Sequence, residues 1–123
     1  MKILVVDDSN FVRSLIGKTL QNNVTNLELI MASNGIEGYD LYRTENPDLI
    51  VMDLLMPEMN GWELLKLIRE VDLSTKIIIF TADVQRATRD EIEEHGITAF
   101  MQKPFNKEKA EQLISIIEEE FGA

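Results

Sequence analysis

The side chains that could do chemistry follow apolar runs of the sequence. Asp7 and Asp8 follow the first such run, and Asp53, Thr81 and Lys103 each follow a later one. A single polar residue after a strand is most often a helix cap or part of a solvated loop. In open α/β sheets, however, ligands bind in the crevice beyond the carboxyl ends of the strands. The coincidence predicts that these five side chains meet at one site.

The three carboxylates point to a metal ion. Carboxylates brought to one edge of a sheet repel one another, and they stay ionised together only beside a cation or a basic group. A ligand set of oxygen atoms favours Mg²⁺, whereas zinc is usually held by histidine or cysteine. The chain has no cysteine, and His95 is the only histidine. It lies near the end of an acidic helical stretch, where a positive charge is favourable, and it has no partners for a metal site.

Carboxylates around Mg²⁺, with one hydroxyl and one ammonium, suggest phosphoryl transfer to a carboxylate. Asp53 is the best candidate nucleophile, because it ends the central third strand beside the first. Mg²⁺, the Lys103 ammonium and the Thr81 hydroxyl would then neutralise or hydrogen-bond the phosphoryl oxygens.

Five strand-length apolar runs alternate with amphipathic stretches of helical length. The expected strands are Lys2 to Val6, Leu27 to Met31, Asp48 to Met52, Lys76 to Phe80 and Thr98 to Gln102. Ser9 or Asn10, Asn60-Gly61 and Asn106 are expected to begin the first, third and fifth helices, and Gly96 to close the fourth. Such alternation with short connections predicts an α/β fold, in which a parallel sheet has helices on both faces.

Length and composition limit what the protein can be. With 123 residues, the chain is expected to form one domain, residues 1–123. The formal net charge of -10 repels nucleic acid and anionic lipid surfaces, so neither is an expected partner. No apolar run is long enough for a membrane span or a signal peptide. We therefore expect a cytoplasmic protein.

The chain resembles a known family, the receiver domains of bacterial and archaeal response regulators, also called the CheY-like family. The matching segments are Val5-Val6-Asp7-Asp8-Ser9 with Arg13, Asp53-Leu54-Leu55-Met56-Pro57-Glu58-Met59-Asn60-Gly61, Thr81-Ala82 and Lys103-Pro104-Phe105. Each motif alone is weak, but together they cover nearly the whole chain in the right order and spacing. The resemblance implies a flavodoxin-like, doubly wound sheet of five parallel strands in the order 2-1-3-4-5, with five helices.

The resemblance also implies a role for each matching residue near the metal. Asp53 would be the phosphoacceptor, Asp8 a direct Mg²⁺ ligand, and Asp7 a ligand through water. Leu55 would supply its backbone carbonyl to the metal, for which an apolar side chain is acceptable. Leu55, two residues after the acceptor, and Asp83, two residues after Thr81, would control how water reaches the phosphoryl group.

The resemblance implies that the other matching residues hold the phosphoryl group and pass the effect of phosphorylation to the protein surface. Thr81 and Lys103 would hold the phosphoryl group, and Phe100 occupies the position of the switch aromatic, where many members have tyrosine. The fourth helix, fifth strand and fifth helix would form the output surface. The Lys103-Pro104 peptide is often cis in this family.

The function that we expect is a signalling switch and not an enzyme, since its only reactions are its own phosphorylation and dephosphorylation. Its partners would be a sensor histidine kinase or phosphotransfer protein, a downstream target protein and a phosphatase, in chemotaxis or another two-component phosphorelay. Phe11 lies one turn from Asp8, outside the apolar stripe of its helix. It is either partly buried against a loop or a contact for the kinase's phosphotransfer domain or a phosphatase.

Three other functions fit the sequence less well. A haloacid-dehalogenase enzyme also forms an aspartyl phosphate, but it normally has a second acid where this chain has Leu55. A flavodoxin-like electron carrier needs a Ser/Thr/Gly loop for the flavin phosphate, which Asp7 and Asp8 would repel. The third alternative, a receiver that belongs to a larger response regulator or hybrid kinase, is excluded less firmly. The expectation against it is that no output domain or linker follows Ala123.

Overall fold

The apolar runs and amphipathic stretches fold as alternating strands and helices. The computed structural model describes residues 1–82 and 85–122. The strands are β1 (Lys2–Val6), β2 (Glu28–Ala32), β3 (Leu49–Met52), β4 (Lys76–Thr81) and β5 (Ala99–Gln102). The helices are α1 (Asn10–Asn23), α2 (Gly35–Glu45), α3 (Gly61–Val71), α4 (Arg86–Glu93) and α5 (Lys107–Phe121). Every strand boundary lies within one residue of the position expected from the sequence.

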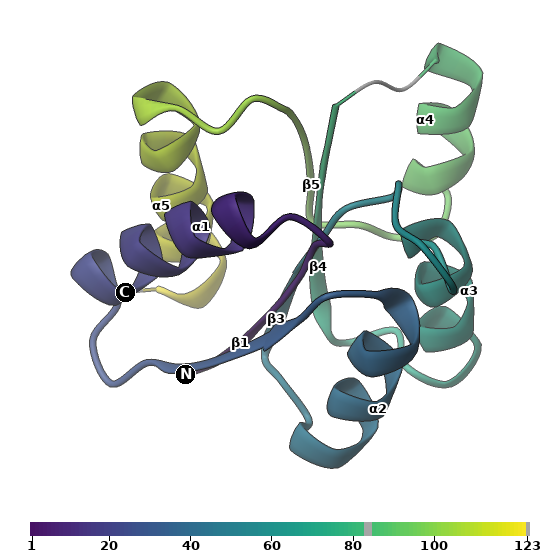
Figure 1. Ribbon diagram of the computed structural model, residues 1–123, viewed down its shortest axis with the longest axis horizontal. Helices are drawn as coiled ribbons and strands as arrows, with labels where there is room; N and C mark the ends of the chain where they lie inside the picture. The colour runs from purple at the N-terminus through teal and green to yellow at the C-terminus, as the bar shows by residue number, and fades with distance from the viewer. Residues whose placement is uncertain (83–84, 123) are drawn as a thin grey trace.

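The five strands form one parallel sheet in the order β2-β1-β3-β4-β5. Helices α1 and α5 cover one face, and α2, α3 and α4 cover the other (Figure 1). The predicted fold class and strand order are therefore confirmed. Because β1 and β3 are neighbours, with Val6 opposite Met52, the residues that follow these two strands emerge side by side.

The core is divided between the two faces of the sheet, because alternate residues of a strand point to opposite faces. On one face, Ile3 and Val5 pack with Ile16 of α1 and Leu113 of α5. On the other face, Leu4 and Val6 pack with the residues of α2, α3 and α4. This burial on both sides explains why β1 is apolar from Ile3 to Val6 and is followed by a polar residue only at Asp7.

Polar caps fix where the helices begin, and so where the loops near the sheet edge lie. The side chains of Ser9, Asn60 and Asn106 accept hydrogen bonds from backbone N–H groups in the first turns of α1, α3 and α5. Asn34 caps α2 in the same way, which was not predicted. Helix α4 ends three residues before Gly96, whose φ of 74° is left-handed. None of the helices in the described ranges has the length and apolar character needed to cross a membrane.

Candidate functional site

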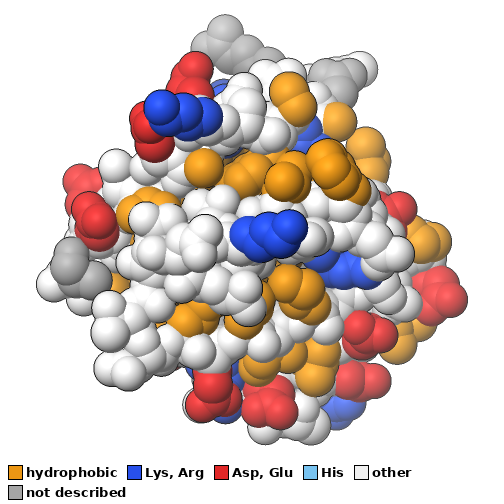
Figure 2. Space-filling view, turned by 60° about the vertical axis from the view of Figure 1, so that its left-hand side comes forward, with side chains coloured by type: hydrophobic (Ala, Val, Ile, Leu, Met, Phe, Trp, Pro, Cys, Tyr) orange, Lys and Arg blue, Asp and Glu red, His pale blue; other side chains and the backbone are white. Residues whose placement is uncertain are grey.

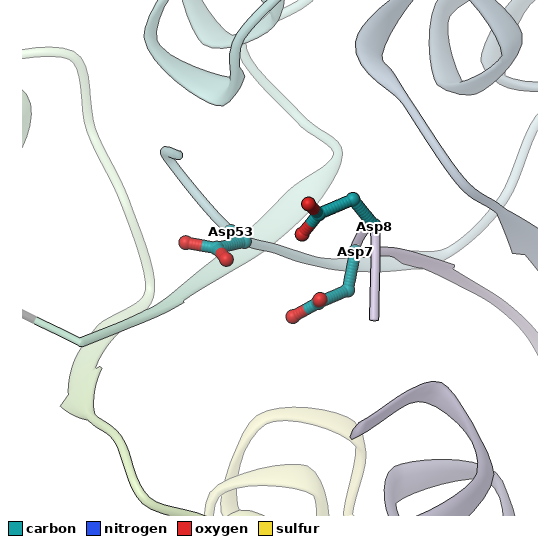
Figure 3. Close-up of side chains that lie close together, drawn as sticks. All are labelled: Asp7, Asp8 and Asp53. Atoms are coloured by element: carbon teal, nitrogen blue, oxygen red, sulfur yellow. The ribbon is translucent and has the colours of Figure 1, made fainter. Parts of the chain in front are cut away.

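Three carboxylates meet at the carboxyl edge of the sheet. Asp7 and Asp8 directly follow β1, and Asp53 directly follows β3. Figure 3 shows the three side chains directed into one space, and a carboxylate oxygen from each lies within 4.8 Å of the other two. Asp7 and Asp53 are buried, with 2% and 4% of their surface exposed, whereas Asp8 is exposed. The cluster therefore has a buried floor and opens to solvent beside Asp8.

Lys103 enters the cluster from the end of β5. Its Nζ lies 2.8 Å from Asp53 Oδ2 and 3.0 Å from Asp7 Oδ2. Partial burial by itself would lower the pKa of Lys103, but hydrogen bonds and charge from Asp53 and Asp7 outweigh it, so the pKa is raised. The peptide between Lys103 and Pro104 is cis. Lys103 is thus a charged ammonium held between two carboxylates.

Asp7 is the carboxylate that the protein environment disfavours. Burial raises the pKa of Asp7 above its ordinary value, and the nearby charge of Asp53 adds to this effect. Hydrogen bonds from the Ser9 N–H, at 2.9 Å, and from Lys103 offset only part of the rise. The guanidinium of Arg13 also donates to the Asp7 carbonyl oxygen, a contact that the sequence motif alone does not indicate. The folded protein therefore disfavours the ionised form of Asp7 relative to an aspartate in water.

Thr81 brings an unsatisfied hydroxyl to this edge of the sheet. It is the last residue of β4, the strand between β3 and β5, and it is fully buried. Within the described part of the chain, its Oγ1 is the buried side-chain atom that has no hydrogen-bond partner. Buried polar groups almost always have partners in native proteins. An orphaned hydroxyl next to the strands that carry Asp53 and Lys103 suits a ligand oxygen.

Leu55 and Gly61 both contact Asp53 and fix the loop that follows it. The Leu55 N–H donates to Asp53 Oδ1 at 3.1 Å, while the Leu55 side chain is 62% exposed. Gly61, the first residue of α3, packs directly on the backbone of Asp53: a Cβ there would lie 1.9 Å from the Asp53 carbonyl oxygen. Only glycine allows this approach, so Gly61 sets the position of the loop between Asp53 and α3.

These groups together fit a divalent cation and an anionic oxygen ligand. One lysine neutralises only part of the charge of three carboxylates, and all the available ligand atoms are oxygens, as Mg²⁺ prefers. The raised pKa of Asp7 and the orphaned Thr81 hydroxyl are the structural signs of such ligands. Asp7, Asp8 and Asp53 could hold the metal, and Thr81 and Lys103 could bind the anion.

The other residues singled out in the sequence lie outside this cluster. Phe100 on β5 is half-buried, and the guanidinium of Arg89 from α4 lies 4.8 Å from its ring centre. Phe11 on α1 is 72% exposed. His95 packs edge-on against Trp62, with 4.9 Å between the ring centres. Asp83 lies outside the described residues.

Comparisons with known proteins agree on one family. The family model described as "Response regulator receiver domain" matches residues 3–115. Chemotaxis protein CheY of Bacillus subtilis is 34% identical over 93% of this chain and 94% of its own length. Sporulation initiation phosphotransferase F of the same organism is 33% identical over 85% and 83%. Among solved structures, a CheY-like receiver domain protein from Methanospirillum hungatei has a TM-score of 0.87 at 25% identity, covering 98% of this chain and 93% of that one.

Proposed function

The chain belongs to the response regulator receiver domain family, and on this premise we propose that it is a stand-alone receiver that is phosphorylated on Asp53. The observation that carries the proposal is the position of Asp53. Its carboxylate lies beside those of Asp7 and Asp8 and pairs with the Lys103 ammonium, next to a strand that ends in an orphaned hydroxyl. The match to CheY over 94% of that relative's length supports a single receiver domain spanning residues 1–123.

In the proposed reaction, a carboxylate oxygen of Asp53 attacks the phosphorus atom of a phosphohistidine on a sensor histidine kinase or phosphotransfer protein. The new P–O bond replaces the P–N bond, and the histidine leaves with the bonding electrons and takes up a proton. Mg²⁺, when bound, would supply positive charge that offsets the negative charge of the carboxylates and the transferred group. Asp8, Asp53 and the Leu55 carbonyl would hold the ion directly, and Asp7 would hold it through water.

Lys103 and Thr81 have separate tasks in this proposal. Lys103 now neutralises Asp53 and Asp7, and after phosphorylation its ammonium would pair with a phosphoryl oxygen instead. The Thr81 hydroxyl would donate to another phosphoryl oxygen and so gain the hydrogen bond that it lacks. Phosphorylation would thereby pull the end of β4 toward Asp53.

This movement is the proposed signal. Phe100 lies on β5, next to β4, where Ile79 pairs with it in the sheet. When Thr81 moves, the Phe100 ring would fill the space that it leaves, and the Arg89 guanidinium of α4 would lose or change its contact with the ring. The surface formed by α4, β5 and α5 would then bind a downstream target protein.

The family is one of signalling switches, and we propose that this chain has no reaction other than its own phosphorylation and dephosphorylation. A separate phosphatase would reset it. Phe11 is too exposed to be part of the hydrophobic core. It would contact the kinase's phosphotransfer domain or the phosphatase. The cellular location would be the cytoplasm, and chemotaxis is one pathway that the CheY relatives suggest. A receiver unit of a larger response regulator or hybrid kinase is the second candidate.

The test is phosphorylation by acetyl phosphate or a phosphorylated sensor kinase, with and without Mg²⁺. Wild type should be labelled only with Mg²⁺, and Asp53→Asn should not be labelled, because an amide is a poor nucleophile. Asp40→Asn is the matched control, since Asp40 is an exposed aspartate on α2, and it should be labelled as wild type is. Acid-labile, hydroxylamine-sensitive label retained in Asp53→Asn would refute the assignment.

A further inference from the structure

Helix α5 has a second side that faces away from the proposed output surface. Its side toward α1 borders a groove of about 420 Å³, to which α1 contributes Thr19 and Asn23. The part of α5 that lines this groove consists of Lys107, Ala110, Glu111, Ile114, Ser115 and Glu118. Figure 1 shows α1 and α5 side by side on one face of the sheet. The groove is separate from the three-carboxylate site.

The residues of α5 that line the groove form one stripe along the helix. Positions 107, 111, 114 and 118 recur at intervals of three or four, so their side chains point the same way. Ile114 and Ala110 are half-buried in the middle, and the charged residues at both ends are exposed. Among the residues that the structure describes, neither Lys107 nor Glu118 takes part in a salt bridge.

The order of side chains along this stripe is self-complementary. If a second α5 lies antiparallel across the first about a two-fold axis near position 112, Lys107 of each copy meets Glu118 of the other. Ala110 meets Ser115, two small residues that allow the helices to approach closely, and Ile114 meets the aliphatic part of Glu111. Lys107 and Glu118 are about 16 Å apart along the helix, so one arrangement satisfies both ends at once.

We infer that the groove between α1 and α5 is the contact surface of a homodimer in which the two α5 helices pack antiparallel. A two-fold dimer requires a surface that complements itself, and the charge order of the stripe meets this requirement. In Figure 2, which turns the α1 and α5 side forward, apolar side chains show between polar ones and form no continuous patch. The dimer should therefore be weak and concentration-dependent.

The experiment is sedimentation velocity over a range of protein concentrations at a fixed ionic strength. Wild type should form dimers as its concentration rises. Lys107→Glu places like charges at both ends of the interface, and so does Glu118→Lys, so each variant should dimerise about tenfold more weakly. An equimolar mixture of the two should associate again, because every pair in the mixed dimer is then of opposite charge.

Two controls separate this pairing from the effect of overall charge. The double variant Lys107→Glu/Glu118→Lys keeps the net charge of wild type and should regain its dimerisation. Glu119→Lys changes the net charge by the same amount as Glu118→Lys, but Glu119 lies one position outside the stripe. The net charge of -10 makes copies repel, so this control should dimerise at least as well as wild type. Circular dichroism would check that each variant is folded.

The proposal would be overturned by a wild-type protein that stays monomeric at millimolar concentration. It would be overturned equally by Glu118→Lys and Glu119→Lys variants that behave alike, or by two single variants whose mixture remains monomeric. These outcomes do not depend on whether Asp53 accepts a phosphoryl group, because no step of the experiment uses that reaction.

Discussion

The two edges of the sheet each hold a polar cluster, and the clusters differ in how far the chain itself satisfies them. At the carboxyl edge, three carboxylates share one lysine, the pKa of Asp7 is raised, and the Thr81 hydroxyl has no partner among the described residues. At the amino edge, the Asp72 carboxylate accepts hydrogen bonds from Tyr42, Ser74 and Thr75. At the carboxyl edge, charge and a hydroxyl remain unsatisfied by the described residues, whereas at the amino edge the described residues satisfy the Asp72 carboxylate.

Arg69 completes the amino edge. Its guanidinium donates to the carbonyl oxygens of Asp72, Thr75, His95 and Gly96. It thereby joins the end of α3 to the loops before β4 and β5. Burial tends to raise the pKa of Asp72, but the hydrogen bonds that it accepts hold this pKa well below its usual range. Burial, together with the bond to Asp72, raises the pKa of Tyr42 to about 12.

The largest expected difference between the edges is in stability. Asp72→Asn replaces an accepting carboxylate oxygen by an amide N–H₂, which faces groups that are themselves hydrogen-bond donors. The substitution should therefore lower the free energy of unfolding by roughly 2 kcal/mol or more. Asp7→Asn, the same substitution at the carboxyl edge, should be neutral or stabilising by up to about 1 kcal/mol, because it removes a disfavoured charge. Urea unfolding without divalent cations would measure both. Equal losses in the two variants would contradict the comparison.

The pH dependence of the same variants should differ in sign. Because the pKa of Asp72 is lowered in the folded state, its stabilisation is present above about pH 4 and is lost as the pH falls further. The folded pKa of Asp7 is raised, so wild type should lose stability relative to Asp7→Asn as the pH rises above about 4. A constant difference between wild type and Asp72→Asn down to strongly acidic pH would argue against the low pKa.

A smaller effect is expected on the lifetime of the phosphorylated form. The exposed Leu55 side chain beside Asp53 cannot orient a water molecule by hydrogen bonding. Leu55→Asn should speed hydrolysis by about tenfold, a barrier change of roughly 1.4 kcal/mol. Loss of label after removal of the donor would measure it in both proteins. Unchanged decay, or decay that is already fast in wild type, would show that Leu55 does not limit the access of water.

The smallest effect contrasts two buried threonines. Thr75 donates its hydroxyl to Asp72, so Thr75→Val should cost about 1 kcal/mol of stability. Thr81→Val replaces an orphaned hydroxyl by a methyl group of similar size and should be neutral or stabilising by about the same amount. Thermal unfolding without ligand would compare them. A larger loss for Thr81→Val than for Thr75→Val would mean that the Thr81 hydroxyl is already satisfied.

The carboxyl edge could be predicted from the sequence because its residues directly follow strands. Once the runs before Asp7, Asp53 and Lys103 are recognised as parallel strands, the topology alone brings these ends together. The roles of these residues remain predictions. The amino edge could not be predicted, because Tyr42 and Asp72 are 30 residues apart and belong to no spacing pattern. The same applies to Gly61, whose need for glycine depends on how closely α3 approaches Asp53.

The most direct test of the central claim is the effect of Mg²⁺ on the thermal unfolding midpoint of wild type, Asp8→Ala and Asp72→Asn. A cation that binds only the folded site raises the midpoint as its concentration increases. The account predicts that Mg²⁺ raises the midpoints of wild type and Asp72→Asn by the same amount and leaves that of Asp8→Ala unchanged. An equal rise in Asp8→Ala, or no rise in wild type, would contradict it.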